Sequence, residues 1–369
     1  MRAEEKREII LCIMQDVPLS KGGVPMARVR TLLIGLMLLS FIFAFNAQAE
    51  ESRRLGLNMA LRNFGEDIKP MQELGANTIR VPLQWQLIRI RPGEYDWTGV
   101  DRLLKTAQTK QIDVLFNIRT TFKEDAKKYK RQRAPTLIKS GSVDMEQWLH
   151  FVGTLANRYR GQGVNYEIEN EVNGENVWKG TLEEYLELLK AGYDVIKKAD
   201  PQAKVLPSAM GCGIVRNFQS GLVRREAWKW HDGWLEPILS TKKFDVVNIH
   251  DYYFPSEIVA NGLTFGSYLE HIFELMKKTG LGDRPVWITE TGFVSQPTET
   301  SGRKDHGSPE KQAEWLTEAY QQGFEFGVER IYWLLLYDRK EPYFGPMGLA
   351  DAKGNPRPAW NALKRFIRK

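Results

Sequence analysis

The sequence has few of the residues that build metal centres or disulfide frameworks. Among 369 residues there are two cysteines, Cys12 and Cys212, and five histidines. Neither a Cys-x-x-Cys nor a His-x-x-x-His spacing occurs, and calcium-type acidic loops and glycine-rich phosphate loops are also absent. The sequence therefore gives no support for a metal, for another cofactor or for a disulfide-stabilised scaffold.

A strong excess of one charge and a membrane-length apolar segment are also missing. The 52 Lys and Arg against 46 Asp and Glu give a net charge of +6, which is too mild and too dispersed to indicate nucleic-acid binding. The one long apolar run, Thr31–Phe45, is shorter than the roughly 20 residues that span a bilayer. With 42% hydrophobic residues, the chain has enough apolar side chains for a sizeable core.

Residues 26–49 have the order of a secretory signal peptide. Two arginines precede the apolar run, and Ala47-Gln48-Ala49 follows it as a small-residue cleavage site. Residues 1–25 have mixed charge, so we interpret them as an upstream extension that is not part of the natural protein, with translation starting at Met26. We expect a periplasmic or secreted protein with no stable membrane insertion after cleavage; an uncleaved anchor is the alternative.

Beyond the signal peptide, short β-branched runs alternate with longer segments of helical period. This alternation is typical of a parallel sheet with crossover helices. Eight runs are predicted to be strands: Leu55–Ala60, Asn77–Pro82, Asp113–Ile118, Val164–Asn170, Lys204–Ala209, Phe244–His250, Pro285–Glu290 and Arg330–Leu335. No linker divides residues 50–369, so the pattern predicts an α/β protein with a single (β/α)8 TIM barrel, whose active site would lie at the carboxyl ends of the strands.

Two glutamates follow predicted strands where a barrel places its reactive groups. Glu171 follows the fourth strand and Glu290 ends the seventh. Hydrolysis of a glycosidic bond needs such a pair, because one carboxyl group protonates the leaving oxygen while the other attacks the anomeric carbon or activates water. Glu167, Glu169 and Glu171 are spaced two residues apart, so all three could point inward from one face of the strand, with Glu171 nearest the substrate. A charge at Glu167 would need a partner, and Arg80 on the second strand is the candidate.

Several segments, in order, resemble clan A glycoside hydrolases. That clan carries its acid/base in an Asn-Glu pair after strand 4 and its nucleophile at the end of strand 7, as at Glu171 and Glu290 here. Tyr166–Asn173 is similar to the Tyr-Glu-Ile-Trp-Asn-Glu-Pro-Asn pattern of families 39 and 5, and departs from it at Glu169 and Val172. Similar segments after strand 2 and before the last helix extend the resemblance over nearly the whole mature chain.

The resemblance implies a retaining β-glycoside hydrolase that acts on an oligo- or polysaccharide by double displacement, with Glu290 as nucleophile and Glu171 as acid/base. It implies further roles for these residues: Arg80 supporting the nucleophile, Asn170 bonding the sugar 2-hydroxyl, His250 and Tyr252 as the clan's His-X-Tyr with the tyrosine touching the nucleophile, and Trp333 as a platform under the sugar. For Arg80, His250 and Trp333 the alternatives are structural: an ion pair, a buried histidine and a core aromatic ring.

Two features bear on the substrate. Trp178, seven residues after the acid/base, is a candidate for a further sugar subsite, with interior packing as its alternative. Basic side chains gather after the third strand: Lys123, Lys127, Lys128, Lys130, Arg131, Arg133 and Lys139. A positive rim there would attract an anionic polysaccharide, although a solvated loop is the preferred interpretation.

Two other functions are compatible with this sequence. One is a catalytically silent barrel that binds polysaccharide in an export or biofilm complex, but a binder has no need of both carboxylates. The other is a transglycosylase, which uses the same residues and differs only in whether a sugar or water accepts the intermediate. The sequence does not name the sugar, the linkage, or endo or exo action.

The signal-peptide interpretation makes a direct prediction. Export should remove residues 1–49, so that the mature protein begins at Glu50. N-terminal sequencing of periplasmic or secreted material measures this. A mature chain that still carries Met1 or Met26 would contradict cleavage.

Overall fold

The computed structural model describes residues 55–367, apart from 121–139, 142, 175–176, 212–223, 254–263, 301–302 and 340–345. The chain forms two units, Met1–Glu50 and Glu51–Lys369. The predicted upstream extension, the predicted signal peptide and the basic stretch at 123–139 lie outside the described residues.

Eight parallel strands form the centre of the second unit. They are β1 (Leu55–Asn58), β2 (Thr78–Gln84), β5 (Asp113–Arg119), β6 (Val164–Ile168), β7 (Val205–Pro207), β8 (Val247–Tyr253), β9 (Val286–Phe293) and β12 (Val328–Trp333). Their order in the sheet is β7-β6-β5-β2-β1-β12-β9-β8. Each predicted strand overlaps one of these, and the predicted TIM barrel is confirmed.

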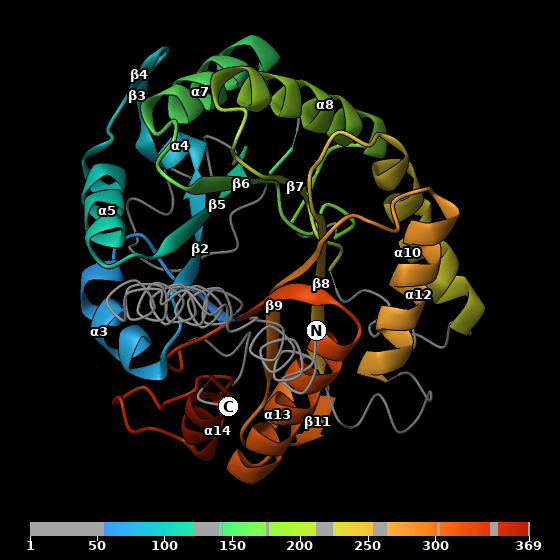
Figure 1. The fold of residues 1–369 in the computed structure, drawn as a ribbon. Helices are drawn as coiled ribbons and strands as arrows, with labels where there is room; N and C mark the ends of the chain where they lie inside the picture. Colours follow the sequence, from blue (N-terminus) through green and yellow to red (C-terminus); the bar gives the residue numbers. More distant parts are fainter. Residues whose placement is uncertain are drawn as a thin grey trace, which may run out of the picture. The chain divides into compact units, whose positions relative to one another are not determined.

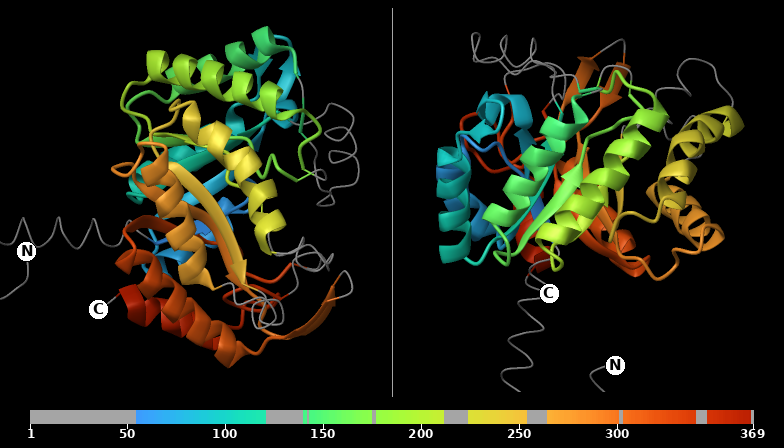
Figure 2. Two further views of the ribbon diagram at one scale, coloured as in Figure 1. Left: turned by 90° about the vertical axis from the view of Figure 1, so that its right-hand side faces the viewer. Right: turned by 90° about the horizontal axis from the view of Figure 1, so that it is seen from above.

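The helices follow the strands in alternation and surround them, as Figure 1 shows. They are α3 (Phe64–Leu74), α5 (Thr98–Thr109), α7 (Met145–Arg158), α8 (Leu182–Ala199), α10 (Arg224–Ser240), α12 (Phe265–Lys278), α13 (Pro309–Glu325) and α14 (Pro358–Ile367), with a short α4 (Trp85–Ile88) after β2. Two hairpins, β3 (Arg89–Arg91) with β4 (Glu94–Tyr95) and β10 (Pro297–Thr300) with β11 (Arg303–His306), interrupt the alternation, and Figure 2 shows the second projecting from the barrel. Among the described residues, no helix is long and apolar enough to cross a membrane.

Local sequence signals set the helix starts. Thr181 and Glu184 form a complete capping box at α8, in which each side chain accepts a hydrogen bond from the other residue's backbone N–H. Ser308 caps α13 by accepting from the N–H of Lys311, and Pro309 occupies the first turn. Such caps satisfy backbone donors that a helix start leaves without a partner, so they fix where each helix begins.

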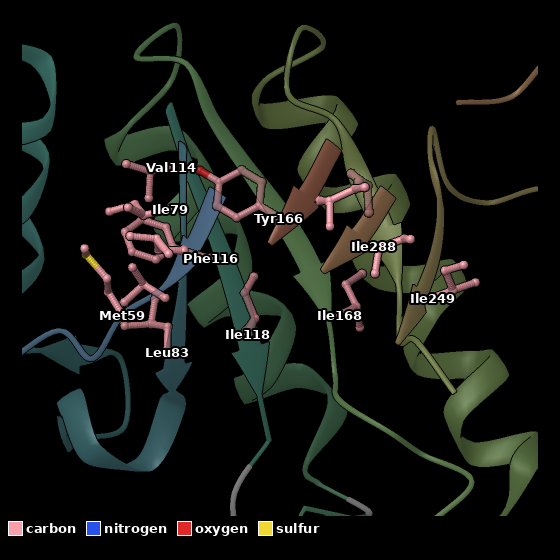
Figure 3. Close-up of a cluster of buried hydrophobic side chains, with 14 of the residues drawn as sticks. Met59, Ile79, Leu83, Val114, Phe116, Ile118, Tyr166, Ile168, Ile249 and Ile288 are labelled. Atoms are coloured by element: carbon pink, nitrogen blue, oxygen red, sulfur yellow. The ribbon is translucent and has the colours of Figure 1, made fainter. Parts of the chain in front are cut away.

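The strands divide their side chains between two cores. On β2, Ile79, Val81 and Leu83 point outward to the helices and are at most 1% exposed. Figure 3 shows the corresponding outward residues of β5, Phe116 among them, in the same cluster. Residues at the alternate positions face the lumen, as the two-residue period of a strand requires. There an apolar cluster fills part of the barrel: Leu115, Leu206, Val246, Trp287 and Tyr332.

The barrel closes between β7 and β8 through one backbone hydrogen bond and two hydrogen bonds of side chains. The N–H of Asp245 donates to the carbonyl oxygen of Val205 at 2.8 Å, and the carboxylate of Asp245 accepts from the N–H of Val205 at 2.9 Å. Pro207 has no N–H to continue a ladder, and its carbonyl oxygen accepts from the Asn248 side chain at 3.1 Å instead. Closure brings the carboxyl ends of β6, β8 and β9 around one mouth.

Gly56 on β1 makes room for a lumen ring, which leads to a stability prediction. A Cβ at this position would overlap the buried Tyr332 ring, whose hydroxyl is fixed by Thr78 at 2.9 Å. We expect Gly56→Ala to lower the free energy of unfolding by about 1–3 kcal/mol through overpacking.

The matched control is Gly65→Ala in α3, where a Cβ would meet nothing within 4 Å. Alanine should leave stability unchanged there or raise it by up to about 1 kcal/mol through helix propensity. Urea unfolding of both variants measures the difference. Equal free energies of unfolding for the two variants would show that the Tyr332 ring can move aside with no loss of stability.

Candidate active site

The backbone after β6 leaves the extended conformation. The strand ends at Ile168, short of the predicted Asn170, and both Glu169 (φ 68°) and Glu171 (φ 44°) are left-handed. For residues other than glycine this conformation costs about 1–3 kcal/mol, so neighbouring contacts must hold it. The Asn117 side chain is one of them and donates to the carbonyl oxygen of Glu169 at 2.7 Å. The expectation that the three glutamates share one strand face is therefore wrong, because alternation applies only to extended residues.

Each of these glutamates has a different partner. Glu167 faces Arg80 in the lumen. Glu169 is fully buried and accepts from the N–H of Thr120 at 2.5 Å, next to β5. Glu171 accepts from or donates to His250, whose Nδ1 is 3.0 Å from its Oε1. Of the three, Glu171 alone is partly exposed at the mouth.

Arg80 connects the buried charges of the site. Its guanidinium donates to both oxygens of Glu167, from Nε at 2.5 Å and from Nη2 at 2.9 Å, so the predicted ion pair is present. Nη1 donates to Glu290 Oε1 at 2.5 Å and to Asn58 Oδ1 at 2.9 Å, and Nη2 also donates to Asn170 Oδ1 at 2.7 Å. Burial acts to lower the pKa of Arg80, but the two carboxylates outweigh it and raise the pKa, so the side chain stays charged.

Glu290, within β9, is held as an anion. Oε1 accepts from Arg80, and Oε2 accepts from the hydroxyl of Tyr252 on β8. Burial would raise the pKa of Glu290, but the charges of His250 and Arg80 and the Tyr252 hydrogen bond lower it to about 2. The carboxylate is therefore ionised over the whole range in which the protein would work.

His250 lies between the two carboxyl groups. Nδ1 is 3.0 Å from Glu171 and 3.7 Å from Glu290 Oε2. Nε2 donates to the hydroxyl oxygen of Thr289 at 3.1 Å, because that hydroxyl gives its own proton to Asn248 at 2.7 Å. Burial acts to lower the pKa of His250, but Glu290 and Glu171 together raise it.

The two carboxyl groups are close enough to act on one bond. One oxygen of Glu171, one of Glu290 and a nitrogen of His250 all lie within 4.8 Å of one another. These atoms could ligate a divalent cation, although both oxygens of Glu290 already accept hydrogen bonds. A buried anion beside a more exposed carboxyl group is suited to nucleophilic attack next to a proton donor.

Asn170 and Trp333 were expected to touch the sugar. Asn170 Oδ1 accepts a hydrogen bond from Arg80, so the amide nitrogen of Asn170 is directed away from the guanidinium. The residue is 9% exposed. Trp333 is fully buried, packs against Trp315 with ring centroids 5.9 Å apart, and donates its N–H to the carbonyl oxygen of Met347 at 3.0 Å. A sugar platform needs an open ring face, so the structure differs from the expectation for Trp333.

Trp178 also lies in the interior. It is 4% exposed, its N–H donates to the carbonyl oxygen of Thr181 at 3.1 Å, and its ring meets Tyr185 edge to face. An isolated bridge to Ser140 links its backbone to the segment before α7. These contacts are those of the packing alternative, in which the ring anchors the start of α8.

Three residues of the site were missed in the sequence. Asn58 ends β1 and donates to the carbonyl oxygens of Thr289 and Trp333, at 2.9 and 3.3 Å, while it accepts from Arg80. Arg119 ends β5, and its charge opposes the rise in pKa that burial causes at Glu169. Asn58 and Arg119 end their strands, so the rule that found Glu290 would also have selected them, whereas Thr289 lies within β9.

Solved structures resemble this chain in fold. A family 39 glycoside hydrolase from Bacteroides cellulosilyticus WH2 is 17% identical, with a TM-score of 0.61, over 86% of this chain and 64% of its own. The endo-1,4-β-D-mannanase of Thermotoga petrophila RKU-1 is 16% identical, with a TM-score of 0.58, over 86% and 99%. The exo-β-1,4-mannosidase of Opitutaceae bacterium strain TAV5 is 16% identical, with a TM-score of 0.57, over 85% and 59%. The chain therefore spans less than two thirds of the first and third of these proteins.

The sequence also matches a protein family. A search of curated proteins finds no match. The cellulase model of glycosyl hydrolase family 5 does match, over residues 56–336. This stretch runs from β1 past β12 and includes Arg80, Glu171 and Glu290. Because the match covers well over half of the chain, this protein belongs to glycosyl hydrolase family 5.

Proposed function

We propose that this protein is a retaining β-glycosidase, with Glu290 as nucleophile and Glu171 as general acid and then base. The observation that carries the proposal is the approach of the two carboxyl groups, with one oxygen of each within 4.8 Å. Retaining enzymes place their carboxyl groups about 5–5.5 Å apart, whereas inverting enzymes leave about 6.5–9.5 Å for a water molecule.

The reaction then has two displacements. In the first, Glu290 attacks the anomeric carbon, the bond to the leaving oxygen breaks, and Glu171 gives that oxygen its proton. In the second, Glu171 takes a proton from water, the water oxygen bonds to the anomeric carbon, and the bond to Glu290 breaks. Arg80 and Tyr252 hold the nucleophile in place, and the Asn170 amide nitrogen donates to the sugar 2-hydroxyl.

The proposed substrate is an oligo- or polysaccharide outside the cytoplasm. The signal-peptide pattern of residues 26–49 supports a periplasmic or secreted location. The basic stretch begins at Lys123, four residues after Arg119 at the end of β5, which favours an anionic chain. Aryl β-mannosides come first in the screening panel, because two of the structural neighbours are named as a mannanase and a mannosidase. Aryl β-galactosides and β-glucosides complete the panel.

Azide rescue tests the two roles separately. Glu290→Gly should lose activity on aryl β-glycosides by several orders of magnitude, and azide should restore turnover as the α-glycosyl azide, because it attacks from the vacated face. Glu171→Ala should instead yield the β-glycosyl azide, since azide then attacks the glycosyl-enzyme. NMR of the products identifies the anomer.

The control is Glu187→Ala on the outside of α8, which should retain wild-type turnover. The same anomer from both site variants would show that the roles are assigned wrongly. Activity of Glu290→Gly equal to that of the wild type would exclude Glu290 as the nucleophile, and no turnover by the wild type itself would leave the barrel as a binder.

The depressed pKa of Glu290 predicts a pH effect. Catalysis needs the ionised form, so activity falls as pH drops through this pKa. Tyr252→Phe removes a donor to the carboxylate, which raises the pKa and moves the acid limb of kcat/KM upward. A hydrogen bond to a charged group contributes roughly 1.5–3 kcal/mol, so the shift should be about one to two pH units.

Tyr320→Phe is the matched control for this change. Tyr320 is a fully buried tyrosine of α13, on the outside of the barrel. Its pH profile should coincide with that of the wild type. If the acid limb of kcat/KM in Tyr252→Phe coincides with that of the wild type, the ionisation of another group determines that limb.

A further inference from the structure

A second group of titratable side chains lies away from the barrel mouth, between α10 and α12. His231 and Asp232 belong to α10 and His271 belongs to α12. Asp232 Oδ1 is 3.0 Å from His231 Nδ1 and 2.9 Å from His271 Nε2. One nitrogen of each histidine and one oxygen of Asp232 all lie within 4.8 Å of one another. Figure 1 shows these two helices beside each other in the outer ring.

The orientation of His231 is fixed from its far side. Its second nitrogen, Nε2, is 3.4 Å from the hydroxyl of Tyr268, one turn before His271 on α12. Metal-bound histidines commonly give their other N–H to such an oxygen, which sets the ring orientation and the tautomer. In a metal-bound form the Nε2 proton would be directed to Tyr268, which would leave the lone pair of Nδ1 for the ion; without a metal, the Nδ1–H donates to Asp232.

One side chain of this cluster is buried, and the other two are partly exposed to solvent. The side chain of His231 is 1% exposed, whereas those of Asp232 and His271 are 22% and 26% exposed. The buried ligand would hold its position, and the other two would admit an ion from solvent. A water molecule could complete the coordination from that side.

We propose that His231, Asp232 and His271 bind Zn²⁺ or a chemically similar divalent transition metal. Two imidazoles and one carboxylate form a donor set that zinc favours, with bonds of about 2.0–2.2 Å. Ligand atoms at those distances around a tetrahedral ion stand about 3.3–3.6 Å apart. The two contacts of 2.9 and 3.0 Å need to widen by only a few tenths of an ångström to reach that spacing.

The proposed metal site would join the helices that precede and follow β8 in the sequence. α10 leads into β8 and α12 leads out of it, and β8 carries His250 and Tyr252. A second cross-link, Lys278 with Glu236 at 2.7 Å, joins the same two helices on their exposed face. A bound metal would therefore stabilise the support of β8 without entering the reaction.

The test is zinc titration of the untagged full chain by calorimetry after dialysis against a chelator. We expect one Zn²⁺ per chain at this cluster and a rise in melting temperature with the metal. His271→Ala and Asp232→Asn should each weaken zinc affinity by more than the roughly 10–100-fold that follows loss of an outer partner. Co²⁺ in place of Zn²⁺ should give the visible absorption of a tetrahedral ion, and both variants should lose it.

Two controls separate this site from other binding. His150→Ala removes a histidine of α7 that contacts Tyr95, and zinc affinity should not change. Glu171→Gln breaks the second cluster that could hold a metal within the described part of the chain, at the candidate active site, and one Zn²⁺ should still bind. Unchanged affinity in both His271→Ala and Asp232→Asn would overturn the proposal. So would loss of all zinc binding in Glu171→Gln, which would place the ion at the catalytic pair.

Discussion

The active site depends on a single buried cation, the guanidinium of Arg80. From β2 it reaches three other strands, because it donates to Asn58 on β1, to Glu167 on β6 and Asn170 just after it, and to Glu290 on β9. Removing one member of a buried ion pair costs about 3–5 kcal/mol, since the remaining charge is left without compensation. The planar fork of an arginine reaches several acceptors at fixed angles, which a lysine cannot do. The same contacts that neutralise the lumen therefore also set the position of Glu290.

The two carboxyl groups have different surroundings although they lie close together. Glu290 has a cation, a phenol and an imidazole around it, and its pKa is lowered to about 2. Glu171 is on a loop, more exposed, with His250 as its hydrogen-bond partner. Groups whose environments differ in this way can take opposite roles in proton transfer and attack. Thr289 and Asn248 hold His250 from behind, so a chain of hydrogen bonds from the lumen sets the spacing of the pair.

Much of this arrangement could be predicted from the sequence. The eight strands were found because a buried parallel strand is a short apolar run between helical segments, and each run lies where the structure has a strand. Arg80 and Glu167 could be placed in the lumen because they alternate with outward apolar residues in regular strands. Glu290 was found from its place at the end of a predicted strand, and the register of β9 is irregular just before it. His250 and Tyr252 share a face for the same reason, and both contact a catalytic candidate.

The features of the site that were not predicted depend on contacts that no short sequence pattern contains. Periodicity describes a side chain only while the backbone is regular, so it fails at Glu169 and Glu171, where left-handed residues redirect the chain. An aromatic residue at a strand end can line a mouth or seal it, and Trp333 is buried because Trp315 of α13 and the carbonyl oxygen of Met347 reach it. His271 is 39 positions from Asp232, far beyond the spacing of any metal motif. Residues of this kind meet because barrel closure sets helix neighbours, and a sequence pattern becomes informative about them only once the fold is known.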